Sequence, residues 1–289
     1  MPKICNYYVT SQCNDTCEFC PIWQDEEYKK IEEKPFDLIT LKRHGVSILN
    51  ITGGEPLLRD DLPQILKQAK ELGFKTQLTT NGLLYSEKPR WIDGLVDRLF
   101  FSLDYPMAEA HDRSRGIECF HDVIKAIQLA KANGEKPVIK FTLTRDSVLF
   151  LPEMLDLAEK LNVFVYLNPV YDFYNTQGFE QATISHIKYY GRDKRVLLNL
   201  AALEFLKDNG NRTNLPRCRA KQTTITVLPD GKIVSPCFFN QAGVQGREDI
   251  CSSCMRWPYM LPSFDAKLDK YYLLNKWSEF LNKRKGMKL

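Results

Sequence analysis

The first 170 residues alternate short runs rich in β-branched and aromatic residues with amphipathic stretches. We predict strands at residues 4–10, 47–52, 75–80, 98–104, 137–144 and 163–170. In the stretches between them, apolar residues recur in steps of three and four, the spacing of one helix face. Strands that alternate with helices form a parallel sheet with right-handed crossovers. The pattern therefore predicts an α/β fold, whose sheet can lie open or curl into a partial or full barrel.

The length and the charge of the chain bound its organisation and its partners. Its 289 residues suit one large α/β domain, alone or with a small appendage. The formal net charge of +4 is a mild surplus, so we expect no nucleic-acid partner. The first residues, MPKICNYYVT, lack the apolar region of a signal peptide, and no apolar run is long enough for a transmembrane segment. We expect a cytoplasmic protein with reduced thiols.

Polar clusters follow the first four predicted strands. The loop CNDTCEFC, residues 13–20, comes after the first strand, and residues 53–56 (GGEP) come after the second. Residues 79–82 (TTNG) close the third strand, and Ser102 and Asp104 close the fourth. The carboxyl ends of parallel strands meet at one edge of the sheet, where such folds bind their ligands. We therefore expect these clusters to converge on one rim.

Three of the nine cysteines lie within the CNDTCEFC loop: Cys13, Cys17 and Cys20. In a reducing compartment, clustered cysteines more often bind metal than form disulfides. Thiolates are soft ligands that suit zinc or an iron–sulfur cluster. A four-iron cluster held by three cysteines keeps one iron open for a small molecule, and a three-cysteine zinc site also keeps an open position. The spacing alone leaves both metals open.

Taken together, the motifs resemble those of the radical S-adenosylmethionine (radical SAM) enzymes. The three cysteines, with Phe19 before the last, are similar to the CxxxCxxC motif of that family, and residues 53–56 to its GGEP motif. Residues 102–104 (SLD) are similar to its S-[LI]-D element, and residues 111–116 (HDRSRG) to its HDxxRG element. Order and intervals fit over residues 1–170. The resemblance implies a partial (β/α)6 TIM-like barrel and a core domain at residues 1–212.

The resemblance also implies which residues bind the cofactors. Cys13, Cys17 and Cys20 would ligate a [4Fe-4S] cluster, and S-adenosylmethionine (SAM) would chelate the open iron through its amino and carboxylate groups. Further SAM contacts would come from nine residues of the rim motifs: Gly53, Gly54, Glu55, Pro56, Phe19, Ser102, Asp104, Arg113 and Arg115. Glycines permit a close backbone approach, Glu55 can accept hydrogen bonds from the ammonium group, and either arginine can meet the methionine carboxylate. No residue is assigned as a catalytic acid, base or nucleophile.

The reaction that the resemblance implies is reductive. The cluster donates an electron to SAM, the S–C5′ bond breaks, and a 5′-deoxyadenosyl radical abstracts hydrogen from a substrate or adds to it. The substrate would be a small molecule, a lipid or a peptide, and the electron would come from a reductant such as flavodoxin or ferredoxin. A weak likeness to enzymes that attach adenosyl to hopanoid lipids gives an alternative reaction. A non-catalytic zinc or iron–sulfur binding module is the alternative from another class.

A second group of cysteines comprises Cys218, Cys237, Cys251 and Cys254. Alone, four thiolates at these intervals would be typical of a structural zinc site. We predict a β-hairpin between the first two, with strands at 223–227 and 232–234 around a Pro-Asp-Gly turn. The stretch is similar to the start of the SPASM module, and the chain has no cysteine after Cys254, as in the shortened "twitch" form. The resemblance implies one auxiliary [4Fe-4S] cluster, for electron transfer or support, in a module at residues 213–262.

Two further helices are predicted in the C-terminal half. One spans residues 196–206, and the other spans roughly 265–283 within a C-terminal segment at residues 263–289. The last helix is expected to bury its apolar residues: Leu273, Leu274, Trp277, Phe280 and Leu281.

Overall fold

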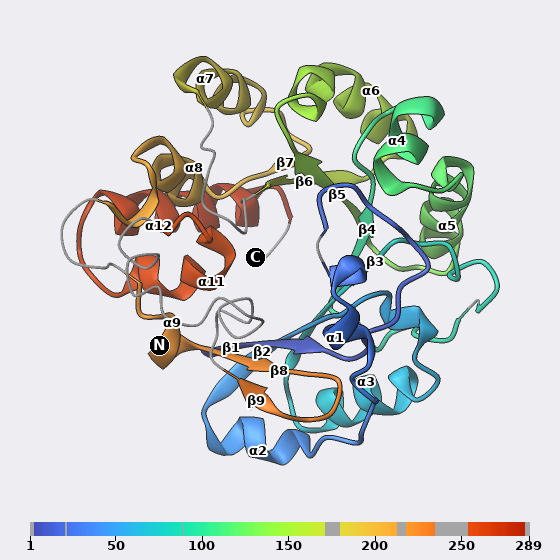
Figure 1. Cartoon of the computed structure of the whole chain (residues 1–289). Helices are drawn as coiled ribbons and strands as arrows, with labels where there is room; N and C mark the ends of the chain where they lie inside the picture. The colour runs from blue at the N-terminus through green and yellow to red at the C-terminus, as the bar shows by residue number, and fades with distance from the viewer. Residues whose placement is uncertain are drawn as a thin grey trace.

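The computed structural model describes residues 3–20, 22–88, 90–170, 180–212, 218–234 and 254–286. A curved sheet forms its centre (Figure 1). Its strands are β1 (Lys3–Tyr8), β2 (Val46–Thr52), β3 (Lys75–Thr80), β4 (Arg98–Ser102), β5 (Pro137–Leu143), β6 (Phe164–Pro169), β7 (Val196–Leu197), β8 (Thr224–Val227) and β9 (Ile233–Val234). The order across the sheet is β7-β6-β5-β4-β3-β2-β1-β8-β9. Every neighbouring pair is parallel except β8 and β9. The α/β fold class and all six predicted strands are confirmed, and the sheet is not closed.

Helices cover the outer side of the sheet and its open side. The α-helices are α1 (Glu26–Lys29), α2 (Leu38–Arg43), α3 (Leu62–Glu71), α4 (Ala108–Arg115), α5 (Phe120–Ala132), α6 (Leu151–Leu161), α7 (Gln181–Tyr190), α8 (Leu200–Lys207), α9 (Ala220–Thr223), α11 (Trp257–Met260) and α12 (Lys270–Arg284). Short 3-10 turns are η1 (Ile22–Gln24), η2 (Pro56–Leu58), η3 (Ser147–Phe150), η4 (Gly210–Arg212) and η6 (Leu261–Asp265). Helices α3, α5 and α6 pack outside β3 to β6, whereas α8, α11 and α12 lie on the open side, between the two edges (Figure 1).

The two faces of the strands differ in chemistry. On the outer face, apolar side chains such as Leu49, Leu78 and Ile139 are fully buried beneath the helices and form the main core. On the inner face, polar side chains such as Asn6, Asn50 and Gln77 line an internal cavity. Successive strand residues point to opposite faces, so each strand contributes to both environments. The hydrophobic core therefore lies between sheet and helices, whereas the interior of the partial barrel mixes polar with apolar side chains.

Two segments of the C-terminal half differ from their sequence-based predictions. The predicted helix at 196–206 begins with β7, which pairs with β6, and becomes helical only as α8. The predicted hairpin is present as β8 and β9, but β8 also pairs in parallel with β1 and so extends the main sheet. Local sequence patterns identify strands but do not tell which sheet edge a strand joins.

Helix α12 forms where predicted, and Leu274 packs against the main core, but the prediction of burial was wrong for three of the five apolar residues. Leu273, Trp277 and Phe280 are 63%, 53% and 46% exposed. Its buried residues are instead Tyr271, Asn275, Ser278 and Asn282. These polar side chains meet polar partners: Ser278 Oγ accepts from the backbone N–H of Leu200 (2.9 Å), and the Asn282 amide donates to the carbonyl of Leu198 (3.2 Å). The helix turns a polar face inward because it covers the polar interior and the start of α8.

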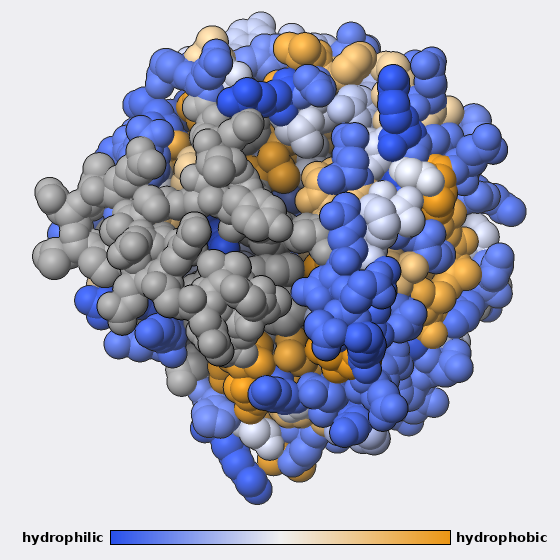
Figure 2. Space-filling view, viewed as in Figure 1, coloured by the Kyte–Doolittle hydropathy of each residue, from blue (hydrophilic) through white to orange (hydrophobic). Residues whose placement is uncertain are grey.

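The visible periphery is mostly hydrophilic, with scattered apolar patches (Figure 2). Within the described segments, no helix is both long and apolar enough to cross a membrane.

Candidate active site

A cavity of about 250 Å³ lies at the carboxyl ends of the strands. It is lined by the three clustered cysteines and by most of the rim residues that the sequence predicts: Cys13, Cys17, Cys20, Phe19, Gly53, Gly54, Glu55, Ser102 and Arg115. The expected convergence of the loops after β1, β2, β3 and β4 on one rim is present. Pro56, Asp104 and Arg113 do not line the cavity.

The loop that follows β1 lies directly against the two glycines after β2. The backbone N–H of Gly54 donates to the carbonyl of Thr10 (2.9 Å), and that of Glu55 donates to the carbonyl of Gln12 (2.8 Å). A Cβ atom added to Gly54 would lie 1.9 Å from the Gln12 oxygen, and one added to Gly53 would lie 2.6 Å from the Thr10 oxygen. Glycine is required here because the two loops touch through their backbones. The glycines thus position the cysteines.

The end of α4 holds the cysteine loop from the opposite side. The backbone N–H of Thr16 donates to the carbonyl of Arg115 (3.0 Å), and that of Glu18 donates to the carbonyl of Ser114 (3.1 Å). Gly116 ends the helix in the left-handed conformation, with φ of 73°. A Cβ atom on this glycine would lie 2.1 Å from Thr16 Oγ1. The glycine of the HDRSRG element therefore serves both the helix end and the loop contact.

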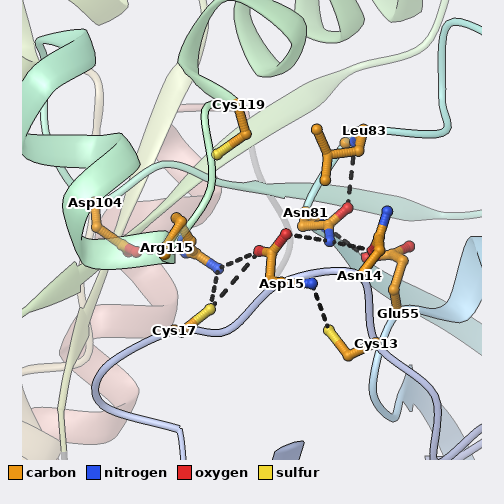
Figure 3. A network of polar contacts seen from close by, with 12 residues as sticks. Cys13, Asn14, Asp15, Cys17, Glu55, Asn81, Leu83, Asp104, Arg115 and Cys119 are labelled. Carbon is orange, nitrogen blue, oxygen red and sulfur yellow. Dashed lines mark hydrogen bonds and ion pairs between the residues drawn. The ribbon is translucent and has the colours of Figure 1, made fainter.

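Arg115 is the buried cation of the site (Figure 3). Its Nη2 lies 2.5 Å from Asp104 Oδ2, and its Nη1 lies 3.6 Å from Asp15 Oδ2. The same Nη1 donates to Cys17 Sγ (3.5 Å), and the guanidinium lies 5.5 Å from the centre of the Phe19 ring. Burial alone would lower the pKa of Arg115, but Asp104, Cys17 and Asp15 raise it above its usual range. The arginine stays charged next to the cysteine loop.

The two arginines proposed for SAM differ in position. The side chain of Arg113 is 71% exposed, and among the described residues it pairs only with Glu109, one turn earlier on α4. Arg115 is buried and lines the cavity. Residues two apart on a helix point to different sides, so only one of the pair faces the site.

His111 and Asp112 of the same element fix the backbone around Asp104 and α5. His111 is fully buried, and its Nδ1 accepts from the backbone N–H of Asp104 (3.2 Å). Burial, with Arg115 nearby, lowers the pKa of His111 to about 4, so the ring is neutral. Asp112 accepts from the backbone N–H groups of Cys119 (2.9 Å) and Phe120 (2.8 Å), where α5 begins.

Asp104 Oδ1 in turn accepts from the backbone N–H of Thr142 (3.2 Å). Asp104 therefore lies behind Arg115 and orients it.

Glu55 presents a buried carboxylate at the cavity wall. Oε1 accepts from Thr80 Oγ1 (2.7 Å) and from the backbone N–H of Leu57 (2.9 Å), and Oε2 accepts from the backbone N–H of Asn81 (2.7 Å). Burial raises the pKa of Glu55 to about 7, and these hydrogen bonds limit the rise. A cationic ligand group in the cavity would stabilise the ionised form.

All three cysteines of the loop line the cavity. No three His, Cys, Asp or Glu side chains within the described segments are arranged to hold a single metal ion. Burial raises the pKa of Cys13 to about 12 and also raises the pKa of Cys17 and of Cys20. Thiolates at these positions therefore need positive charge from a bound group. A cluster with several irons, each taking one thiolate, fits this donor set.

The second cysteine group is described in part. Cys237 and Cys251 lie outside the described residues, whereas Cys218 and Cys254 lie within them. Each of the two sulfurs accepts a hydrogen bond from the backbone N–H two residues later, at 3.4 Å from Ala220 and 3.4 Å from Arg256. Cys13 accepts from Asp15 in the same way, at 3.5 Å. Cysteines of both groups thus share one local backbone geometry.

The cavity also has polar lining residues that the sequence analysis did not single out, among them Asp15, Lys140, Thr142 and Asn168. Lys140 donates to Thr79 Oγ1 (3.4 Å), and burial lowers its pKa to about 8. The sequence could have identified Lys140, because β5 has the sequence PVIKFTL and a lysine inside an apolar strand is unusual.

A comparison with known families agrees with this arrangement. Residues 7–146 match the model of the Radical SAM superfamily. The chain carries a radical SAM domain, and the protein is a radical SAM enzyme. Its cofactors are accordingly SAM and a [4Fe-4S] cluster.

Relatives and solved structures extend the likeness beyond that domain. A probable GTP 3',8-cyclase of Sulfolobus acidocaldarius is 26% identical over 269 residues, covering 85% of this chain and 84% of that protein. The AdoMet-dependent heme synthase of Oleidesulfovibrio alaskensis is 30% identical over 166 residues, covering 55% of this chain and 43% of that protein. Streptococcus suis SuiB, solved with its precursor peptide SuiA, has a TM-score of 0.68 at 18% identity, over 90% of this chain and 65% of that chain. The structural likeness shows a shared fold.

Proposed function

We propose that Cys13, Cys17 and Cys20 ligate the [4Fe-4S] cluster and that SAM binds beside it in the same cavity. The observation that carries this proposal is the shared lining: the three cysteines, Glu55 and Arg115 all face one cavity at the carboxyl ends of the strands. When bound, the cluster supplies an electron to SAM, and SAM supplies the 5′-deoxyadenosyl group.

The protein groups of the cavity have separable tasks in this proposal. The Glu55 carboxylate accepts from the ammonium of SAM, since its own hydrogen bonds hold it in place at the wall. Arg115 stabilises negative charge, both from the buried carboxylates and from the sulfur of Cys17. Phe19 and Ser102 supply an aromatic face and a hydroxyl to the adenosine part. The buried walls limit the access of water to the reacting atoms.

We propose further that Cys218, Cys237, Cys251 and Cys254 hold an auxiliary [4Fe-4S] cluster in a module at residues 213–262. The hydrogen bonds that Cys218 and Cys254 accept from the backbone support this, because such bonds stabilise thiolates and tune cluster potentials. Four protein ligands leave no open iron, so this cluster transfers electrons or supports the fold.

Two kinds of similar protein bear on the class of substrate. The cyclase relative is named for GTP, whereas a peptide is bound in the SuiB structure. The cyclase likeness extends over 84% of that protein, so we favour a small-molecule substrate over a peptide or a lipid. A flavodoxin or ferredoxin would supply the electron.

Anaerobic reconstitution of the full chain tests both metal assignments. We expect about eight iron and about eight sulfide per chain, and 5′-deoxyadenosine should form from SAM only with a reductant such as dithionite. Stoichiometric zinc without 5′-deoxyadenosine would instead identify a non-catalytic metal-binding protein.

Two alanine variants separate the sites. Cys17→Ala should abolish 5′-deoxyadenosine formation, while the auxiliary iron, about four per chain, remains. Cys254→Ala should lose about four iron and keep the cluster on the other three cysteines, which its electron paramagnetic resonance signal with SAM would report. Cys5→Ala is the matched control, since Cys5 is buried in the apolar core and lines neither cavity. Unchanged iron in Cys254→Ala would refute the auxiliary assignment.

A further inference from the structure

A second cavity, of about 290 Å³, occupies the interior of the partial barrel. Its sheet wall is formed by inward-facing residues of β1 to β6, and its other wall by α11, η6 and α12. Three residues line both this interior cavity and the one at the strand ends: Thr79, Lys140 and Asn168. The interior cavity therefore adjoins the place where SAM would bind.

The residues of the interior cavity are unusual for the centre of a sheet. Barrel interiors are ordinarily filled with branched apolar side chains. Here the wall includes Asn6, Asn50, Gln77, Arg98 and Tyr166. Buried polar groups cost free energy unless they are paired. Asn50 donates to Asn6 Oδ1 (2.9 Å), so the case for a polar ligand or water rests on the other polar groups of the wall.

Charge distinguishes between these occupants. Arg98 makes no hydrogen bond or ion pair with any described residue, and burial lowers its pKa. Its neighbour Asp97 is engaged elsewhere, accepting from the backbone N–H of Thr76 at 2.7 Å. The two carboxylates of the cavity, Asp265 and Glu279, both bind Lys276, at 3.0 Å and 3.0 Å. The guanidinium of Arg98 is thus left for an anion from outside the chain.

The register of the sheet gives the length of that ligand. Ser102 of β4 lies opposite Lys140 of β5, and Arg98 is four residues before Ser102 on the same strand. Four residues of strand correspond to roughly 13 Å. A ligand held at Arg98 therefore reaches Lys140 and the SAM cavity only if it is on the order of 10 Å long.

We infer that the interior cavity binds a small molecule with a phosphate or carboxylate group, held by Arg98, whose other end lies at Thr79, Lys140 and Asn168. A guanidinium pairs with either anion through two parallel hydrogen bonds. That this molecule is the substrate rests on the proposed function, whereas the binding site itself does not.

Binding of two simple anions tests the site. The reconstituted full chain, with saturating SAM, is titrated with inorganic pyrophosphate and with succinate by calorimetry. We expect saturable binding of at least one probe, and the tighter one identifies the group. Arg98→Gln should weaken binding tenfold or more, whereas Arg98→Lys should weaken it less. Arg113→Gln, which removes the same charge from the exposed side of α4, should bind like the wild type.

Arginine labelling gives a readout that needs no variant. With SAM present throughout, the bound probe should slow modification of Arg98 by phenylglyoxal several-fold and leave the exposed Arg113 unaffected, as mass spectrometry would show. No saturable binding, or equal binding by wild type and Arg98→Gln, would overturn the inference. Because Arg98 does not line the SAM cavity, its variants should retain the wild-type affinity for SAM. Anion binding without 5′-deoxyadenosine formation would refute the proposed function and leave this site standing.

Discussion

At the scale of single residues, Arg115 balances the charge of the site. It pairs with Asp104 and lies close to Asp15, and all three side chains are buried. Removing one partner of a buried ion pair leaves the other charge uncompensated, at a cost of about 3–5 kcal/mol. We predict that Arg115→Gln lowers the free energy of unfolding by about that amount, measured by urea denaturation of the metal-free protein. Arg113→Gln, on the same helix but exposed, should change it by less than about 0.5 kcal/mol. Equal effects of the two substitutions would contradict the charge network.

His111 makes stability depend on pH. Its pKa is about 4 in the folded protein and about 6.5 in an unfolded chain. Between these values the unfolded chain binds more protons, so the free energy of unfolding falls as the pH is lowered. Protonation of Nδ1 would also break its hydrogen bond with the backbone N–H of Asp104.

We predict that His111 costs the protein about 2 kcal/mol of stability between pH 7 and pH 5. His111→Gln should be less stable than the wild type at pH 7, and the difference should shrink at pH 5, as urea denaturation at both pH values would show. His121→Gln, which alters an exposed histidine, should follow the wild type. A constant difference between His111→Gln and the wild type would disprove this titration.

The residue pattern of α4 shows how far the sequence could predict the site. The motifs identified the cysteines, Glu55 and Ser102, all of which line the cavity. They did not distinguish Arg113 from Arg115, although the buried residues His111, Ser114 and Arg115 follow the three-and-four spacing of a helix face. The contacts of Asp15 and Lys140 depend on which loops and strands meet, and short motifs do not encode that.

At the scale of elements, the sequence predicted the strands of the first half. For the last helix, α12, it predicted the position but not most of the buried face. Five of these six strands place two or more apolar residues in the main core, whereas β3 (KTQLTT) contributes only Leu78 and was predicted from its β-branched threonines and its place between helices. In α12 the buried face is mostly polar, and Ser278 and Asn282 on it bind backbone groups of neighbouring segments, so the hydrophobic pattern alone misplaced three of the five apolar residues. Tertiary hydrogen bonds determined the orientation instead.

Substitutions on α12 test this orientation. Trp277→Gln removes a large side chain that is 53% exposed, so we predict a change of less than about 0.5 kcal/mol in the free energy of unfolding. Ser278→Ala should cost about 1–3 kcal/mol, because the half-buried N–H of Leu200 loses its acceptor. Thermal or urea denaturation of both variants gives the comparison. A larger loss from Trp277→Gln than from Ser278→Ala would restore the apolar face as the buried one.

At the scale of the whole molecule, the sheet is closed on one side by the C-terminal segment rather than by strand pairing. The indole N–H of Trp257 donates to the carbonyl of Pro169 (2.9 Å), and the hydroxyls of Tyr8 and Tyr259 lie 3.2 Å apart. These contacts join α11 to β6 and β1 across the opening. They are long-range and polar, which is why the sequence predicted a separate C-terminal segment but not its place against the barrel.

The shared wall of Thr79, Lys140 and Asn168 has a thermodynamic consequence. A ligand that rearranges these side chains from the interior cavity changes the affinity of the other cavity for SAM. Linkage requires that SAM change the affinity for the interior ligand by the same factor. SAM and the interior ligand would then bind cooperatively rather than independently, and the two cavities would act as one unit.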